Sequence, residues 1–176
     1  LLFLTSATPN VVVGTEGWLY YAGEMGDYQH MGVMSEAAVQ NAAKNLSLVQ
    51  EYFEGLGKRF ALVVAPNKST ACPGHVPYYR VRAENASNLE RLLFELRRRG
   101  VNVVDVGDLL SGREDLSFSR DSHWNDAGAL VVYEAILEGL GRPSAGIGSV
   151  GLVTDVHVGD LDAMLHPASA TPELQQ

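Results

Sequence analysis

The sequence predicts an α/β domain with a mostly parallel sheet and an N-terminal β-hairpin. Three observations lead to this prediction: apolar stripes with helical spacing, short continuous apolar runs between them, and a glycine-bounded turn near the start. The chain has 176 residues, of which 46% are hydrophobic and 19% charged, which is enough apolar surface for one sizeable core. We therefore expect residues 1–176 to form a single domain.

The first part of the chain alternates extended and helical patterns. Residues 11–21 hold two β-rich runs around a glycine-bounded turn, which is typical of a β-hairpin. Ser35 precedes a long apolar stripe that stops at Gly57, which predicts a capped helix between them. The apolar run 60–65, closed by a proline, predicts a strand that is buried on both faces.

The middle of the chain repeats this alternation after a proline-rich loop. Residues 83–99 carry leucines on one side and predict a helix, and 101–106 predict a second short buried strand. A β-α-β order of this kind predicts a right-handed crossover and parallel pairing of the two strands. We expect a short extended segment at 116–119 to follow.

The last part begins with a helix that Asn125 or Asp126 caps. This helix should end before the Gly- and Ser-rich stretch 141–151, which predicts a loop. Residues 152–158 are then expected to form a further strand. Residues 168–176 are polar and aperiodic, which indicates a frayed tail or a linker.

Charge and cysteine content exclude several classes of function. The formal net charge of −8 disfavours attraction to nucleic acid or to an anionic membrane surface. The single Cys72 can form no intramolecular disulfide and has no neighbours with the spacing of zinc ligands. No apolar stretch approaches the roughly 20 residues that a membrane-spanning helix needs. We therefore expect neither a nucleic-acid partner nor a structural metal.

The segment Asp121-Ser122-His123-Trp124 is the strongest candidate for chemistry. In extended backbone Asp121 and His123 share a face, beside the carboxyl end of a strand, where parallel sheets bind their ligands. A carboxylate next to an imidazole fixes its tautomer and stabilises the imidazolium that forms when the ring accepts a proton. The spacing alone leaves three roles open: a general base with its orienting carboxylate, a pair that starts a helix and packs, or metal ligands that no nearby His or Cys completes.

Four motifs stand in order along the chain: Gly-Thr-Glu-Gly-Trp-Leu-Tyr-Tyr at 14–21, Val-Val-Ala-Pro-Asn-Lys-Ser at 63–69, Asp-Ser-His-Trp-Asn at 121–125 and Gly-Asp-Leu-Asp-Ala-Met-Leu at 159–165. Together they resemble the landmarks of the alginate O-acetyltransferase family (AlgX/AlgJ type), a circularly permuted branch of the SGNH hydrolases. The resemblance implies a three-layer α/β/α, flavodoxin-like SGNH domain.

The resemblance also implies a Ser-His-Asp type of acyl transfer without a cofactor. His123 would deprotonate a serine, Asp121 would orient the imidazole, and an acetyl group would pass to a hydroxyl of alginate or another cell-surface polysaccharide. In this family the serine follows the Gly-Asp-Leu motif. We therefore expect the domain to be incomplete at its C-terminus, with the nucleophile outside this chain and the chain alone inactive; Ser149 and Ser69 are weaker candidates.

Three further residues are expected near the same edge of the sheet. Lys68 would bind a carboxylate or help to hold an oxyanion, or else be a solvated loop lysine. Trp124 would shape the pocket beside His123, and Asn125 would bind substrate or shape the site. Three other histidines carry no spacing signal that gives them a role: His30, His157 and His166.

Partners and location follow from the resemblance. It implies a polysaccharide acceptor, an acetyl donor supplied through a membrane-bound O-acyltransferase, and a place in the periplasm or otherwise outside the cytoplasm, with an anchor in a missing N-terminal segment. Two alternatives remain: a carbohydrate esterase that uses water as acceptor, and a non-catalytic polysaccharide-binding or scaffold module of an export complex. The oligomeric state stays open.

Overall fold

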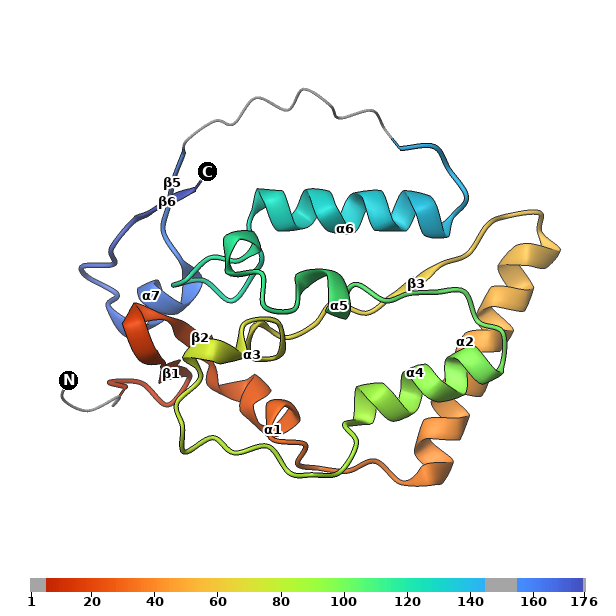
Figure 1. Cartoon of the computed structure of the whole chain (residues 1–176), viewed down its shortest axis with the longest axis horizontal. Helices are drawn as coiled ribbons and strands as arrows, with labels where there is room; N and C mark the ends of the chain where they lie inside the picture. The colour runs from red at the N-terminus through yellow and green to blue at the C-terminus, as the bar shows by residue number, and fades with distance from the viewer. Residues whose placement is uncertain (1–5, 145–154, 176) are drawn as a thin grey trace.

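The structure is a computed structural model that describes residues 6–144 and 155–175. Figure 1 shows the arrangement of its helices and strands. In chain order these are β1 (Val11–Val13), β2 (Leu19–Tyr21), α1 (Met25–Tyr28), α2 (Glu36–Gly55), β3 (Leu62–Val63), α3 (Lys68–Ala71), α4 (Asn88–Arg98), β4 (Val103–Val104), α5 (Gly107–Leu110), α6 (Asp126–Gly139), β5 (Asp155–His157), α7 (Asp160–Leu165) and β6 (Glu173–Gln175). Short 3-10 turns lie at Thr15–Gly17, Ala22–Glu24, Pro73–His75 and Glu114–Leu116.

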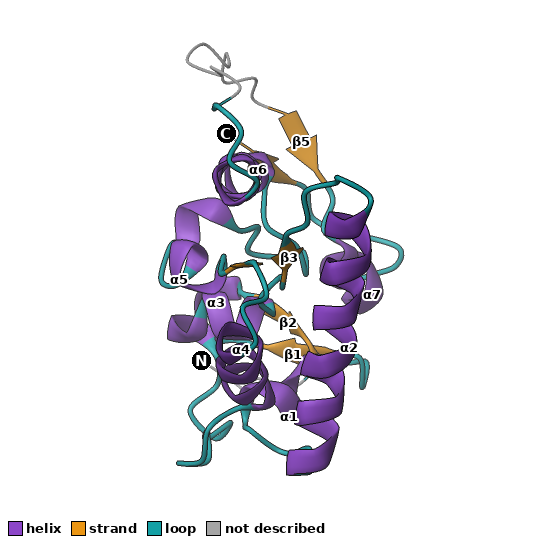
Figure 2. Ribbon diagram, turned by 90° about the vertical axis from the view of Figure 1, so that its right-hand side faces the viewer, coloured by secondary structure: helices purple, strands orange, loops and turns teal. Residues whose placement is uncertain are grey.

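The predicted N-terminal hairpin is confirmed. β1 and β2 pair antiparallel, with Val11 opposite Tyr21 and Val13 opposite Leu19. The turn between them needs positive φ angles, which Glu16 (55°) and Gly17 (85°) adopt. In Figure 2 this hairpin and the short strand β3 lie between helices.

The helices α2 and α4 pack on each other. α2 begins where predicted, because the Ser35 hydroxyl oxygen accepts the N–H of Ala38 at 3.2 Å. The predicted helix 83–99 begins later than expected, at Asn88. Ser87 and Glu90 form a capping box there, in which each side chain accepts the backbone N–H of the other. Between these helices and the adjoining strands lies an apolar cluster of Ala43, Leu93, Leu96 and Val101.

The predicted β-α-β order and its parallel strand pairing are also confirmed, whereas the right-handed crossover stays a prediction. β3 and β4 pair parallel, with Leu62 opposite Val103 and Val63 opposite Val104, and α4 lies between them in the sequence. Both strands are shorter than predicted. The described residues form three two-stranded sheets, of which this one is parallel and the other two antiparallel. A larger, mostly parallel sheet therefore stays a prediction.

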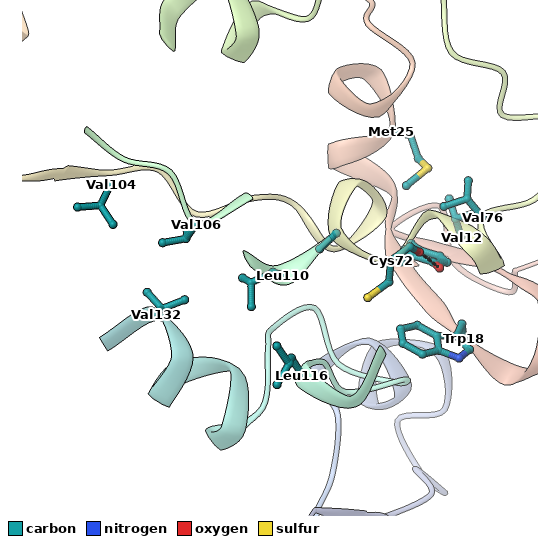
Figure 3. Packing of buried hydrophobic residues seen from close by; sticks show 12 residues of the cluster. Val12, Trp18, Met25, Cys72, Val76, Val104, Val106, Leu110, Leu116 and Val132 are labelled. Atoms are coloured by element: carbon teal, nitrogen blue, oxygen red, sulfur yellow. Dashed lines mark hydrogen bonds between the residues drawn. The ribbon is translucent and has the colours of Figure 1, made fainter. Parts of the chain in front are cut away.

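The main core joins the hairpin, α3, β4 and α6 (Figure 3). Asn125 caps α6, because its Oδ1 accepts the N–H of Gly128 at 3.0 Å. α6 then packs against β4 through Val132 and Val104. The buried members of this core are Val12, Trp18, Tyr20, Met25, Ala71, Cys72, Val76, Val104, Val106, Leu110, Leu116 and Val132. No helix among the described residues is long and apolar enough to cross a membrane.

Two predictions about the second half were wrong in part. The segment 116–119 is no strand of the β3–β4 sheet; Leu116 ends a 3-10 turn, and Ser117 forms an isolated antiparallel bridge with Trp124. The tail 168–176 is not wholly frayed, because β6 pairs antiparallel with β5. Of the strand predicted at 152–158, the described part is extended at Asp155–His157, and residues 145–154 lie outside the described residues.

Candidate active site

The side chain of Asp121 is the centre of the site. The residue is only 4% exposed, and its two carboxylate oxygens accept four N–H groups. Oδ1 accepts the backbone N–H of His123 at 2.9 Å and the Nδ1 of its ring at 2.7 Å. Oδ2 accepts the backbone N–H of Asp160 at 2.9 Å and the Nε2 of His157 at 2.8 Å. All strong acceptor directions of this carboxylate are therefore used.

These hydrogen bonds keep Asp121 ionised. Burial by itself raises the pKa of the carboxyl, but the N–H of Asp160 and the two imidazoles outweigh it, so the pKa lies well below its ordinary value. An ionised carboxylate can only accept hydrogen bonds. The proton of the neutral His123 ring is therefore on Nδ1.

The tautomer leaves the Nε2 of His123 free to act as a base. The ring is held at Nδ1, yet the side chain is 74% exposed. It lines a pocket of about 180 Å³ together with Ala65, Pro66, Lys68, Ala71, Leu110, Ser117, Ser122 and Trp124. An exposed imidazole that lines a pocket and has one nitrogen fixed by a carboxylate is the arrangement of a general base.

Ser122 and Ser69, two serines of the described part of the chain, are not placed as nucleophiles. Ser122 donates its hydroxyl to Asp160 Oδ2 at 2.6 Å and faces the occupied Nδ1 of His123 at 3.2 Å. Ser69 is fully buried in α3. Ser149 lies outside the described residues.

Lys68 begins α3 and points into the protein. Its ammonium donates to three backbone carbonyls: Leu19 O at 2.7 Å, Ser119 O at 2.8 Å and Asp121 O at 2.8 Å. It also lies over the ring of Trp18, 4.9 Å from the centroid. Burial lowers the pKa of Lys68 to about 8. Because its three N–H groups are used, Lys68 ties the hairpin and α3 to the backbone of Asp121 and is no solvated lysine.

The other two predicted residues flank the base. Trp124 is half-buried, lines the pocket and packs against the main core. The Asn125 side chain is occupied by the backbone, since its Oδ1 caps α6 and its Nδ2 donates to Asp115 O at 2.8 Å. Asn125 therefore shapes the site by fixing the start of α6.

The Gly-Asp-Leu motif holds the Asp121 loop from the other side. A Cβ at Gly159 would collide with the carbonyl of Arg120, so a glycine permits this close approach. It brings the Asp160 N–H to Asp121, and the Asp160 carboxylate accepts the backbone N–H of Ser122 at 2.8 Å. Leu161, fully buried, anchors the motif against the hairpin.

Sequence reasoning gave no role to His157, Asp160 or Glu173. His157 reaches Asp121 from β5, 36 residues along the chain. Glu173 of β6 accepts the backbone N–H groups of Ser119 and Arg120, each at 3.0 Å. Asp160 lies inside the Gly-Asp-Leu motif at 159–165, and this position could have indicated a role for it. No local sequence pattern indicated a role for His157 or Glu173.

Three residues offer atoms that could ligate a metal. One ligand atom each of Asp121, His123 and Asp160 lie within 4.8 Å of one another, so Asp160 supplies the neighbour that the sequence did not reveal. The carboxylates are already engaged, however: Asp121 accepts four N–H groups and Asp160 accepts two donors from Ser122. A cation would have to displace these donors, so the cluster fits a hydrogen-bond network better than a metal centre.

Comparisons with known proteins identify the family and the fold of the chain. The family model described as "SGNH hydrolase-like domain, acetyltransferase AlgX" matches residues 11–176. Two solved structures share the fold. The O-acetyltransferase domain of Pseudomonas putida AlgJ has 19% identity and a TM-score of 0.60, over 96% of this chain and 64% of that chain. Pseudomonas aeruginosa AlgX has 16% identity and a TM-score of 0.64, over 93% of this chain and 42% of that chain.

This chain thus spans less than two thirds of the length of either solved structure. A search of curated proteins found no match. The family model nevertheless covers almost all of the chain, and the resemblance drawn from the four motifs is confirmed. The chain belongs to the family of SGNH hydrolase-like domains of the acetyltransferase AlgX.

Proposed function

We propose that the protein is an O-acetyltransferase that esterifies hydroxyls of alginate or a related cell-surface polysaccharide. The observation that carries the proposal is the Asp121–His123 pair, with Nδ1 held at 2.7 Å and an exposed imidazole that lines the pocket. Membership of an acetyltransferase family and the likeness to the O-acetyltransferase domain of AlgJ support the reaction class.

The proposed reaction has two half-reactions. His123 Nε2 takes the proton of a serine hydroxyl while the serine oxygen attacks the acetyl carbonyl of the donor. The imidazolium then protonates the leaving group, and an acetyl-serine remains. In the second half Nε2 deprotonates a sugar hydroxyl, which attacks the acetyl-serine, and the imidazolium returns the proton to the serine oxygen as its bond to the acetyl group breaks. Asp121 stays ionised throughout and stabilises the imidazolium.

We further propose that the serine comes from a part of the protein beyond residues 1–176. The family order of the motifs supports this, as do the hydrogen bond from the Ser122 hydroxyl to Asp160 and the complete burial of Ser69. The same resemblance supports a place outside the cytoplasm and a donor supplied through a membrane-bound acyltransferase. Water in place of the sugar hydroxyl would make the protein an esterase.

The first test is hydrolysis of a nitrophenyl acetate ester by the full-length protein. We expect His123→Ala and Asp121→Asn each to lower kcat/KM by about 10² or more, since each removes part of the general base. His30→Asn is the matched control, because His30 lies outside the pocket and asparagine tolerates its φ of 56°. Equal activity of wild type and His123→Ala contradicts the proposal, and inactive full-length protein that binds the polymer favours the scaffold alternative.

A further inference from the structure

We propose that His157 is a positioning residue for this acyl transfer. Its imidazole holds the Asp121 carboxylate at the torsion angle that points Oδ1 at Nδ1 of His123. The inference rests on the proposed function, since it assigns a further residue to the same reaction. His157 itself does not touch the reacting atoms; it acts through Asp121.

The geometry divides the Asp121 carboxylate into two halves. Each oxygen accepts one backbone N–H and one imidazole nitrogen: Oδ1 those of His123, Oδ2 the N–H of Asp160 and the Nε2 of His157. The terminal torsion of an aspartate is soft, so a carboxylate held by few donors can turn. A second donor on Oδ2 fixes the plane, and thereby fixes the direction in which Oδ1 faces His123.

His157 is itself held in place. Its ring stacks on Phe118, with centroids 4.1 Å apart and planes at 20°. Its strand β5 pairs with β6, where Val156 lies opposite Leu174 and His157 opposite Glu173. Glu173 in turn accepts the N–H groups of Ser119 and Arg120, the two residues before Asp121. β5 and β6 therefore hold both the carboxylate and the backbone that leads to it.

The second imidazole also has a chemical consequence. Because Asp121 is ionised, the Nε2 of His157 must carry the proton of their 2.8 Å hydrogen bond. A donor on Oδ2 draws negative charge from the carboxylate and lowers its basicity. Asp121 then stabilises the imidazolium of His123 without taking its proton, as an orienting carboxylate must.

The experiment compares three substitutions at position 157 in the full-length protein. His157→Gln keeps an N–H donor of similar reach, His157→Phe keeps the stacking on Phe118 but loses the donor, and His157→Asn keeps an amide that is too short. Nitrophenyl acetate hydrolysis gives kcat and KM, proton NMR follows the downfield Nδ1–H of His123, and thermal unfolding reports folding.

We expect His157→Phe and His157→Asn to lower kcat about 10-fold with KM unchanged, and to shift or lose the Nδ1–H resonance, because removal of an outer hydrogen-bond partner costs roughly this much at comparable sites. His157→Gln should restore most of kcat and the resonance. If His157→Phe does not fold, His157→Asn carries the comparison.

Two results would overturn the inference: wild-type kcat with an unchanged resonance in His157→Phe and His157→Asn, or no recovery in His157→Gln. Failure of the proposed function looks different. In that case His123→Ala hydrolyses the ester as well as wild type does, while the resonance still decides whether His157 positions the carboxylate.

Discussion

Asp121 and Lys68 are buried residues of opposite charge, and the backbone carbonyl of Asp121 joins them. The Lys68 ammonium donates to the Asp121 carbonyl, and the Asp121 carboxylate accepts four N–H groups of its own. A buried charge is tolerated when its hydrogen bonds are complete, and a missing partner leaves a costly group behind. At the residue scale, the site is thus built by satisfying two charges with backbone and imidazole groups.

The lowered pKa of Asp121 predicts a pH dependence of stability. As the pH falls below about 5, the unfolded chain binds a proton at this carboxyl before the folded protein does. The stability that Asp121 contributes is therefore present above its unfolded pKa and is lost as the pH falls towards the lower folded pKa.

Urea unfolding between about pH 6 and pH 3 should measure this effect. We expect the free energy of unfolding to fall more steeply with acid in wild type than in Asp121→Asn, which has no carboxyl to titrate at that position. The comparison uses the slope of the free energy of unfolding against pH. The absolute stability is not compared, because asparagine at position 121 also disturbs the hydrogen bonds of the carboxylate. Parallel curves for the two proteins would show that Asp121 is not specially stabilised in its ionised form.

At the element scale, the turn before α7 holds the loop that carries the base. Gly159 lies against the carbonyl of Arg120, Asp160 bonds Asp121 and Ser122, and Leu161 is buried under the hairpin. The turn before α7 and the hairpin therefore both contact the loop that carries His123.

Gly159→Ala should therefore damage both stability and activity. The added Cβ pushes the turn away from Arg120 and draws the Asp160 N–H off Asp121, so we expect unfolding to be easier by about 1–3 kcal/mol. In the same variant kcat for ester hydrolysis should fall. Gly26→Ala is the control, because a Cβ there meets nothing within 4 Å. A Gly159→Ala protein as stable and active as the control would exclude a role for this close contact.

Elements that are formed by local interactions were predicted from the sequence, and those that depend on contacts between distant residues were not. The hairpin, the Ser35 cap and the β3–β4 crossover depend on local turns, caps and apolar runs, and these were predicted. The late start of α4 follows from the Ser87 capping box, a local signal that the leucine pattern obscured. The β5–β6 pairing depends on contacts between Glu173 and a distant loop, which no local pattern reveals.

At the scale of the whole molecule, the four motifs are distant in sequence and meet at one place. Lys68 of the second motif binds Leu19 of the first and Asp121 of the third, and Asp160 of the fourth binds Asp121. Each of these contacts joins one side-chain atom to one backbone atom. The order of the motifs predicted the family, whereas their meeting point became visible only in the fold.

The candidate site, like the fold, could be predicted only where its residues are close in the sequence. Asp121 and His123 are two residues apart, so their pairing could be argued from spacing, and the structure brings them to 2.7 Å. Lys68 was placed near the same edge, but its burial and its three carbonyl partners depend on the packing of α3. His157 had no signal, because a histidine and an aspartate so far apart pair only through tertiary structure.

The most direct test of the proposed function is acetyl transfer itself. The full-length protein is incubated with an acetyl ester donor and short alginate oligosaccharides, and mass spectrometry counts acetyl groups on the oligosaccharides. We expect acetylated oligosaccharides with wild type and none above background with His123→Ala. Acetylation that persists in His123→Ala, or wild-type protein that hydrolyses the donor and never acetylates the sugar, would contradict the proposed function.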